Sequence, residues 1–198
     1  VTVVGIIAIA QTLVILTAGI DLSVGAILVV TSLVMGNLAV NMGLPIWIAV
    51  PLSIAVGGFM GWLNGVLVAV IKLPPFIVTL GTLSIFTALK LWYSGSESIR
   101  NVDIVEKAPE LLWFGEAIRF GGFKLTYGSI SLIVVAIVVW YALNRTAWGR
   151  HVHAVGDDPD AARLSGIPTR GVLISVYAAA GLICGFAAWV AIGRVGSI

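Results

Sequence analysis

The sequence predicts an all-α protein, a polytopic transmembrane helical bundle. Hydrophobic residues make up 60% of the chain and charged residues only 10%, whereas a soluble domain carries about 25% charged residues. The apolar residues are gathered in runs, and several runs reach the roughly 20 residues that one membrane-crossing helix needs. We therefore expect the helices to pack within a lipid bilayer.

Short interruptions rich in glycine, proline or charge separate the apolar runs. Residues 41–45 form a turn pattern, and the consecutive prolines of Lys72-Leu73-Pro74-Pro75 suit the first turn of a new helix. A glycine-flanked break, 19–25, separates the first two helices. The expected helices cover residues 3–18, 24–40, 46–71, 75–93, 129–143 and 171–192.

Most charged residues lie in two segments, 94–127 and 145–170, which we expect on opposite sides of the membrane because one helix separates them. Each segment contains four lysines or arginines. Lys72 is expected on the same side as 145–170. The positive-inside rule then favours a cytoplasmic 145–170 and a periplasmic 94–127.

Small residues recur at helical spacing in two of the expected helices. Gly57, Gly61 and Gly65 lie four residues apart, as do Gly181 and Gly185. This spacing lets helix backbones approach closely in lipid, so we expect these faces to contact other helices of the bundle. The single cysteine, Cys184, lies within an apolar run and is expected to serve packing.

Asp21 is the only acidic residue before Glu97, and it lies in the glycine-flanked break. A carboxylate at membrane depth is costly and usually faces protein or a water-filled path. One interpretation places Asp21 and Ser23 along a polar pathway. The other, compatible interpretation makes either residue the N-cap of the 24–40 helix.

Two polar side chains within expected membrane helices, those of Asn64 and Thr79, are further candidates. The amide of Asn64 can bond across helices or contact a polar solute. The hydroxyl of Thr79 can bond back to its own helix.

A short helix is predicted within segment 145–170. Asp158 is its expected N-cap, Pro159 its first residue, and Asp160 places negative charge at the positive end of the helix dipole. Gly166 then ends the helix. A helix of about two turns is marginal alone in water. It is therefore either an ordinary loop helix at the membrane surface or a helix stabilised by a docked partner.

The sequence contains no complete constellation for catalysis, metal binding or cofactor binding. His151 and His153 would share one face of a strand, but no third ligand lies nearby. No phosphate-binding loop or nucleophile–base pair is present. The slight net charge of +2 gives no indication of nucleic-acid binding. We expect no catalytic residue, no metal and no enzyme activity.

Three ordered segments, 16–25, 61–81 and 154–167, resemble the sugar-type permeases of bacterial ABC importers, which take up ribose, xylose, arabinose or galactose. The first contains Ile20-Asp21-Leu22-Ser23-Val24-Gly25. The second contains Gly61-Trp62-Leu63-Asn64-Gly65 and Lys72-Leu73-Pro74-Pro75-Phe76. The third contains Ala154-Val155-Gly156 and then Asp160-Ala161-Ala162-Arg163-Leu164-Ser165-Gly166-Ile167. Segment 94–127 matches this family least.

The resemblance implies a cytoplasmic coupling helix that contacts a separate ATP-hydrolysing subunit. The residues implied in coupling are Gly156, Asp158, Pro159, Asp160, Ala161, Ala162, Arg163, Leu164, Ser165, Gly166 and Ile167. The residues implied near the translocation path are Asp21, Ser23, Asn64, Phe76 and Thr79.

The resemblance also implies a location and partners. A permease subunit spans the bacterial cytoplasmic (inner) membrane several times and contacts lipid, an ATP-binding subunit, a periplasmic or extracellular solute-binding protein, and a second permease subunit, most simply a copy of itself. Residues 1–198 would form a single permease domain, a fragment lacking helices at both ends. The alternatives are an ABC permease for nucleosides or branched-chain amino acids, or an ion-driven secondary transporter.

Overall fold

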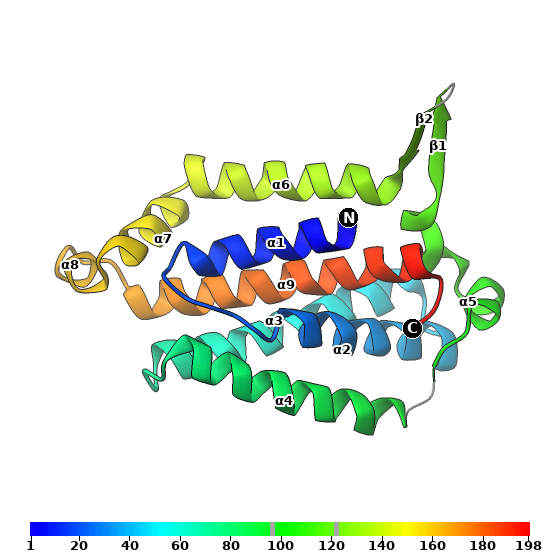
Figure 1. Cartoon of the computed structure of the whole chain (residues 1–198), viewed down its shortest axis with the longest axis horizontal. Helices are drawn as coiled ribbons and strands as arrows, with labels where there is room; N and C mark the ends of the chain where they lie inside the picture. Colours follow the sequence, from blue (N-terminus) through cyan, green and yellow to red (C-terminus); the bar gives the residue numbers. More distant parts are fainter. Residues whose placement is uncertain (96–97, 121–122) are drawn as a thin grey trace.

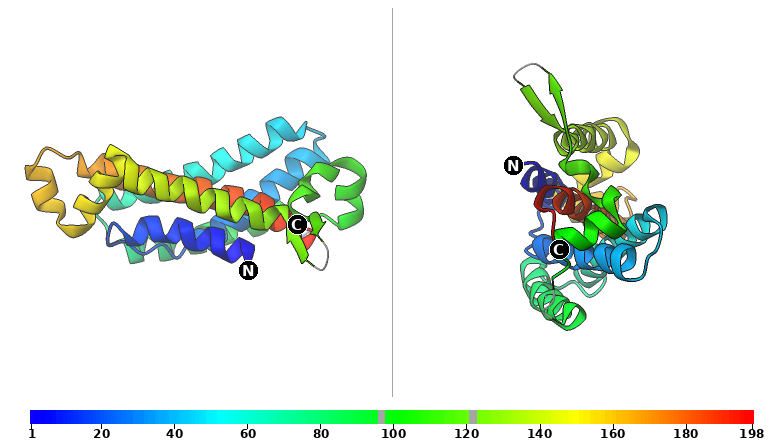
Figure 2. Two further views of the ribbon diagram at one scale, coloured as in Figure 1. Left: turned by 90° about the horizontal axis from the view of Figure 1, so that it is seen from above. Right: turned by 90° about the vertical axis from the view of Figure 1, so that its right-hand side faces the viewer.

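The computed structural model describes residues 1–95, 98–120 and 123–198, so Glu97 lies outside the described residues. Its long helices run side by side along one axis (Figures 1 and 2). Within the described residues, five helices are long and apolar enough to span a membrane. They are α2 continued by η1 (Val24–Asn41), α3 (Ile46–Ala69), α4 (Pro75–Ser94), α6 (Tyr127–Arg145) and α9 (Thr169–Val195).

Helix α1 (Thr2–Ile15) is apolar and ends at Ile15. The chain then turns back, and α2 begins partway along the bundle rather than at its end (Figure 1). This confirms the predicted break. The α-helical part of α2 ends at Gly36, and η1 (Asn37–Asn41) continues it as a π-helix, which the sequence did not predict.

Helices α3 and α9 form the centre of the bundle, and their glycines face each other as predicted. A methyl group on Gly61 would collide with the backbone of Tyr177, and one on Gly57 would lie 2.8 Å from the carbonyl oxygen of Gly181. No side chain separates the two backbones at these points. Cys184 is buried in the same core, as expected.

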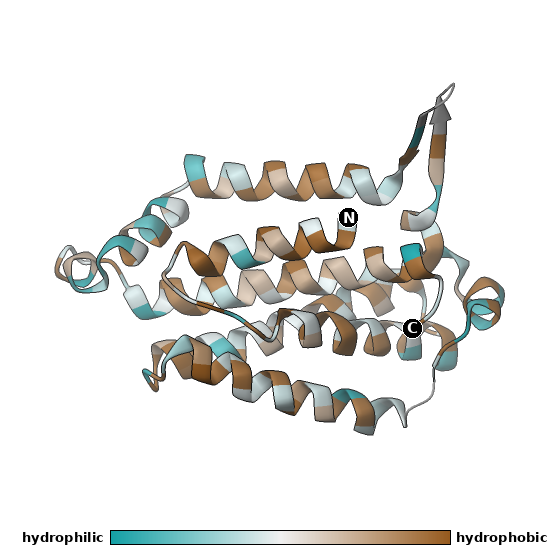
Figure 3. Ribbon diagram, viewed as in Figure 1, coloured by the Kyte–Doolittle hydropathy of each residue, from teal (hydrophilic) through white to brown (hydrophobic). Residues whose placement is uncertain are grey.

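The outer helices α4 and α6 expose large apolar side chains, Ile85 and Trp92 on α4 and Ile137 and Tyr141 on α6 among them. Colouring by hydropathy shows brown, apolar ribbons along the bundle and teal, polar ones mainly at its two ends (Figure 3). Exposed apolar faces of this size suit contact with lipid or with another membrane subunit.

The two polar segments lie at opposite ends of the bundle, as predicted (Figure 1). Segment 94–127 contains α5 (Asn101–Lys107), the 3₁₀-helix η2 (Pro109–Gly115) and an antiparallel hairpin of β1 (Ala117–Phe120) and β2 (Phe123–Thr126). Segment 145–170 contains α7 (Ala147–Asp157) and α8 (Pro159–Leu164). The sequence predicted α8, but it left α7 as loop.

Helix α7 follows α6 after a one-residue corner at Thr146. The Thr146 hydroxyl accepts a hydrogen bond from the Gly149 backbone N–H at 3.2 Å and so caps α7. The indole N–H of Trp148 donates to the Ser175 hydroxyl at 2.8 Å, which ties α7 to α9. Both α7 and α8 are therefore anchored to the membrane-spanning core.

Candidate functional site

The connection between α1 and α2 places polar groups inside the bundle. Ala18 takes the left-handed conformation, with φ of 55°, which costs a residue with a side chain roughly 1–2 kcal/mol. Gly19 follows, and a methyl group there would lie 2.8 Å from the Tyr177 hydroxyl. The chain thus turns sharply against α9 before Asp21.

Asp21 and Ser23 form a closed turn at the start of α2. One carboxylate oxygen of Asp21 accepts hydrogen bonds from the Ser23 backbone N–H at 2.7 Å and the Ser23 hydroxyl at 2.6 Å. Ser23 occupies the N-cap position, but its side chain caps no helical N–H. The predicted side-chain cap is therefore wrong in detail, because the Asp21 carboxylate bonds to Ser23 itself, outside the helix.

Asn64 joins this turn to α3. Its side-chain N–H₂ donates to the Ser23 hydroxyl at 2.8 Å, and both side chains are fully buried. The expectation of an amide bond across helices is thus confirmed. The Asn64 amide oxygen is buried and has no hydrogen-bond partner among the described residues, so the cluster retains one unused acceptor.

Thr79 connects the same break to α4, and Phe76 lies outside it. The buried hydroxyl of Thr79 lies within hydrogen-bonding distance of two carbonyl oxygens, that of Ile20 at 3.1 Å and that of Pro75, one turn back in its own helix, at 2.9 Å. Phe76 is half exposed on the bundle surface. Four of the five residues that the resemblance implies near the path therefore gather at the break, and Phe76 does not join them.

Tyr177 is the residue of this cluster that sequence reasoning missed. It is fully buried on α9, and its hydroxyl, beside Gly19, has no hydrogen-bond partner among the described residues. The sequence could have indicated it, because a tyrosine within an apolar helix buries a phenol hydroxyl, and such a hydroxyl usually has a hydrogen-bond partner nearby.

Helix α8 has both ends capped within the chain. The Asp158 carboxylate accepts from the backbone N–H groups of Asp160 at 2.9 Å and Ala161 at 3.0 Å. At the other end, Gly166 has φ of +85°. The Gly166 backbone N–H donates to the carbonyl oxygen of Arg163, and the Ile167 backbone N–H donates to that of Ala162, each at 3.0 Å. This is the hydrogen-bond pattern of a Schellman motif. The predicted caps are confirmed.

The residues implied in coupling divide into two sets by the direction they face. Ala162 is buried and Ile167 half-buried, and both pack against the hydrophobic core. The outward set has exposed side chains, and within it Leu164 is 86% exposed. Its other members are Asp158, Pro159, Asp160, Ala161, Arg163, Ser165 and Gly166.

Gly156 connects the α7–α8 end to the break. A methyl group at Gly156 would overlap the carbonyl oxygen of Leu16 and would lie 3.4 Å from the Cα of Thr17. The C-terminal turn of α7 therefore rests directly on the backbone that leaves α1. This contact begins five residues before Asp21 in the sequence.

The structure places His151 and His153 on α7, not on a strand. Residues two apart on an α-helix point in different directions, so the shared face on which a metal site would depend does not exist. Within the part of the chain that the structure describes, no group of three or more metal-ligating side chains is found.

The polar turn between α1 and α2 inside a multi-span apolar bundle, together with a capped helix projecting from one end, defines a polytopic integral membrane protein with polar groups held at membrane depth. The chain belongs to the family described as branched-chain amino acid transport system / permease component, whose model matches residues 1–198. No solved structure matches it.

Curated relatives of the chain are named as sugar import permeases. The fructose import permease FrcC of Rhizobium meliloti is 51% identical over 198 residues, all of this chain and 55% of the relative. The ribose import permease RbsC of Escherichia coli K12 is 33% identical over 192 residues, 97% of this chain and 58% of the relative. The galactose/methyl galactoside import permease MglC of Haemophilus influenzae is 31% identical over 155 residues, which are 78% of this chain and 46% of the relative. The chain spans about half the length of these relatives.

Proposed function

We propose that this chain belongs to the permease subunit of a bacterial ABC importer, which forms the translocation path for a monosaccharide or related small polar solute. ATP hydrolysis would take place on a separate subunit, and this chain would itself catalyse no reaction. The family match and the names of the three sugar import permeases support this proposal.

The observation that carries the proposal is α8, a capped helix that presents an exposed leucine beyond the end of the bundle (Figure 1). A helix of six residues is too short to be stable alone in water. The exposed side chain of Leu164 gains no stabilisation from burial within this chain. Both features are explained if α8 inserts into a groove of the ATP-binding subunit. Leu164 would be the central contact, and Ala162 and Ile167 would hold α8 to the permease.

The contact between Gly156 and Leu16 supports a route from that subunit to the membrane interior. A displacement of α8 moves α7, and α7 rests on the backbone that leads into the break. The break holds Asp21, Ser23 and Asn64 in one hydrogen-bonded cluster. We infer that ATP-driven movement reaches these path residues through this contact.

In this proposal the α7–α8 end faces the cytoplasm and the α5–hairpin end faces the solute-binding protein. Charge alone does not decide the orientation, because Arg194, near the C-terminal end of α9, lies at the opposite end and offsets Lys72. The exposed apolar faces of α4 and α6 would contact lipid and the second permease subunit, a copy of this chain in the simplest case.

The family description and the relatives indicate different solutes. The description names branched-chain amino acids, whereas the three relatives are named for fructose, ribose and galactose, and we favour a sugar.

An ion-driven transporter would need paired ionisable groups in the membrane. Asp21 is the only buried charged side chain among the described residues.

The proposal is tested with Leu164→Asp in the full-length permease, purified with the ATP-binding subunit. A central apolar contact in an interface is worth roughly 2 kcal/mol or more, so the affinity for that subunit should fall at least about 30-fold. ATP-dependent uptake of radiolabelled fructose in proteoliposomes that contain the solute-binding protein should be lost.

Val102→Asp is the matched control, because Val102 is also an exposed apolar residue on a short helix but lies at the opposite end. It should leave the affinity for the ATP-binding subunit unchanged. Unchanged affinity in Leu164→Asp would contradict the assignment of α8. ATP-dependent uptake of leucine in place of fructose would favour the amino-acid alternative.

A further inference from the structure

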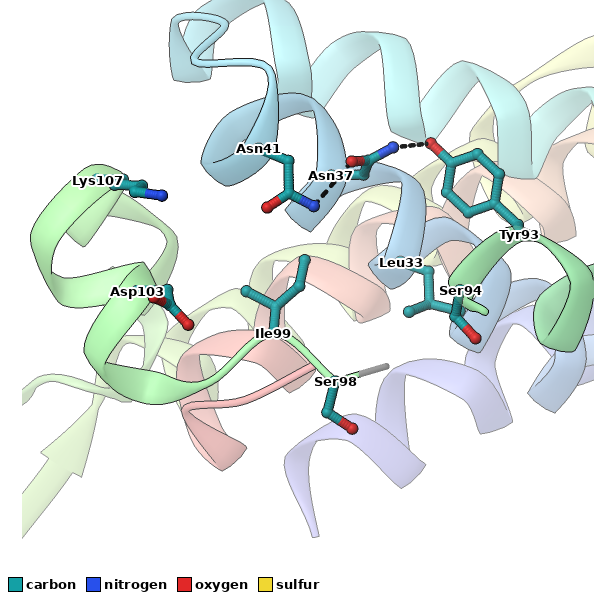
Figure 4. A pocket seen from close by; sticks show the side chains of 9 residues that line it. All are labelled: Leu33, Asn37, Asn41, Tyr93, Ser94, Ser98, Ile99, Asp103 and Lys107. Carbon is teal, nitrogen blue, oxygen red and sulfur yellow. Dashed lines mark hydrogen bonds between the residues drawn. The ribbon is translucent and has the colours of Figure 1, made fainter. Parts of the chain in front are cut away.

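We propose that a polar pocket at the end of the bundle opposite α8 binds the hydroxyl groups of the transported solute. This inference rests on the proposed function. The pocket has a volume of about 260 Å³ and lies between η1, the end of α4 and α5 (Figure 4). Its lining consists of Leu33, Asn37, Asn41, Tyr93, Ser94, Ser98, Ile99, Asp103 and Lys107.

The π-helical turn η1 places two amides on the pocket wall. Asn37 and Asn41 are the first and last residues of this turn. The Asn41 side-chain N–H₂ donates to the Asn37 amide oxygen at 2.9 Å, and the Asn37 N–H₂ donates to the Tyr93 hydroxyl at 2.5 Å. A π-helical turn is rare and occurs frequently at functional sites.

Four polar side chains of the pocket, those of Asn41, Tyr93, Asp103 and Lys107, can form hydrogen bonds to a solute. The structure assigns no hydrogen bond to the Asn41 amide oxygen among the described residues, and the Tyr93 hydroxyl keeps its proton to donate. Asp103 and Lys107 lie one turn apart on α5, and neither forms an ion pair within the described part of the chain. Amide, hydroxyl, carboxylate and ammonium groups thus face one small space.

This set of groups suits a small, neutral molecule that carries several hydroxyls. Each sugar hydroxyl both donates and accepts hydrogen bonds, and the pocket offers both kinds of partner. Only Leu33 and Ile99 present apolar side chains, so the apolar side chain of a branched-chain amino acid finds little to contact. The pocket volume lies just below the range typical of pockets that bind drug-sized ligands, as expected for a site that holds a monosaccharide.

The position of the pocket fits its proposed role. It lies where the spanning helix formed by α2 and η1 ends, beside α5 in the segment that we propose faces the solute-binding protein. Solute released by that protein would enter here before it reaches the break in the membrane. The backbone of Ile99 is held by two hydrogen bonds to Ile198, at 2.8 and 3.1 Å, which fixes one wall of the pocket.

The experiment uses the full-length permease with its ATP-binding subunit and solute-binding protein in proteoliposomes, with radiolabelled fructose as the probe. Asn41→Ala and Tyr93→Phe each remove polar groups from the pocket. Each should lower the initial rate of uptake about tenfold, the usual effect of losing a hydrogen bond to a bound hydroxyl. Stimulation of ATP hydrolysis by the loaded solute-binding protein should persist.

Asn144→Ala is the control, because Asn144 is exposed on α6 outside the pocket. This variant should transport at the original rate. Original rates in both pocket variants would overturn the inference. A parallel loss of affinity for the solute-binding protein would also overturn it, since the surface would then dock that protein. Failure of the unaltered transporter to take up fructose would instead overturn the proposed function.

Discussion

Two aspartates lie just before helices in this chain, and they do so in opposite surroundings. Asp158 is exposed in front of α8, and Asp21 is buried in front of α2. Each accepts a hydrogen bond from the backbone N–H two residues ahead, at 2.9 and 2.7 Å. The sequence encodes the same local turn twice. The surrounding helices turn one copy into a surface cap and the other into part of a buried polar cluster.

The difference matters because the energetic cost of polar groups depends on their access to water. Water can replace Asp158 as the partner of the N–H groups that it bonds, so losing this side chain costs the ordinary value of a cap. Asp21 is only 3% exposed, so the groups that it bonds would be left without partners if it were removed. The three predictions that follow separate these cases, beginning with the contact that joins the two regions.

The largest effect is expected from Gly156→Val, which alters the link between the two regions. The added side chain would overlap the Leu16 carbonyl oxygen, a backbone atom that cannot move aside cheaply. We expect a loss of stability of about 3 kcal/mol or more. Thermal unfolding of the purified full-length protein measures it. A transporter assembled from any folded fraction and the ATP-binding subunit should hydrolyse ATP without uptake.

Gly171→Ala is the control for this variant, because Gly171 also lies in a helix but has open space around it. It should unfold at the same temperature as the original protein or up to a few degrees higher. If Gly156→Val were as stable and as active as Gly171→Ala, the two regions would not communicate through this contact.

The next largest effect is expected at Asp21, where two substitutions distinguish the hydrogen bonds of the side chain from its negative charge. Asp21→Ala leaves the buried N–H and hydroxyl of Ser23 without their acceptor and should cost about 2 kcal/mol. Asp21→Asn keeps an acceptor oxygen and should retain most of the stability. Uptake by Asp21→Asn then decides the role. Retained uptake makes Asp21 structural, whereas lost uptake with normal expression assigns the charge to the path.

The smallest effect is expected from Asp158→Ala, which removes the cap of α8. The helix should lose about 1 kcal/mol, and Asp158→Asn should restore most of it. Hydrogen exchange of the backbone N–H groups of residues 161–165 measures this local loss, while the unfolding temperature of the whole protein stays the same. A global loss of stability equal to that of Asp21→Ala would remove the distinction between the two aspartates.

The parts of the fold that could be predicted are those with local or periodic signals. Apolar runs of membrane-spanning length gave all five spans, and Asp158-Pro159 with Gly166 gave both ends of α8. The glycine spacing correctly indicated close backbone contact between helices. Each of these signals depends only on residues that are near one another in the sequence.

The parts that could not be predicted depend on distant contacts. Gly149 weakens the helical signal of α7, yet a methyl group there would overlap the Leu143 carbonyl oxygen, so the corner after α6 requires glycine. The π-helical turn at Asn37 and the burial of the Tyr177 hydroxyl near Asp21 likewise follow from packing. Their polarity within apolar stretches and the family resemblance indicated four residues at the break, but neither indicated Tyr177 of α9, which faces it.

The glycine contacts between α3 and α9 have a mechanical consequence. Where two backbones touch directly, no side chain can change rotamer to let one slide past the other, so these helices form one rigid unit. We expect any alternation between two shapes of the bundle to occur around this unit. The non-helical stretch 16–23 borders this unit, since Gly19 lies against Tyr177 of α9, and it carries the buried carboxylate of Asp21.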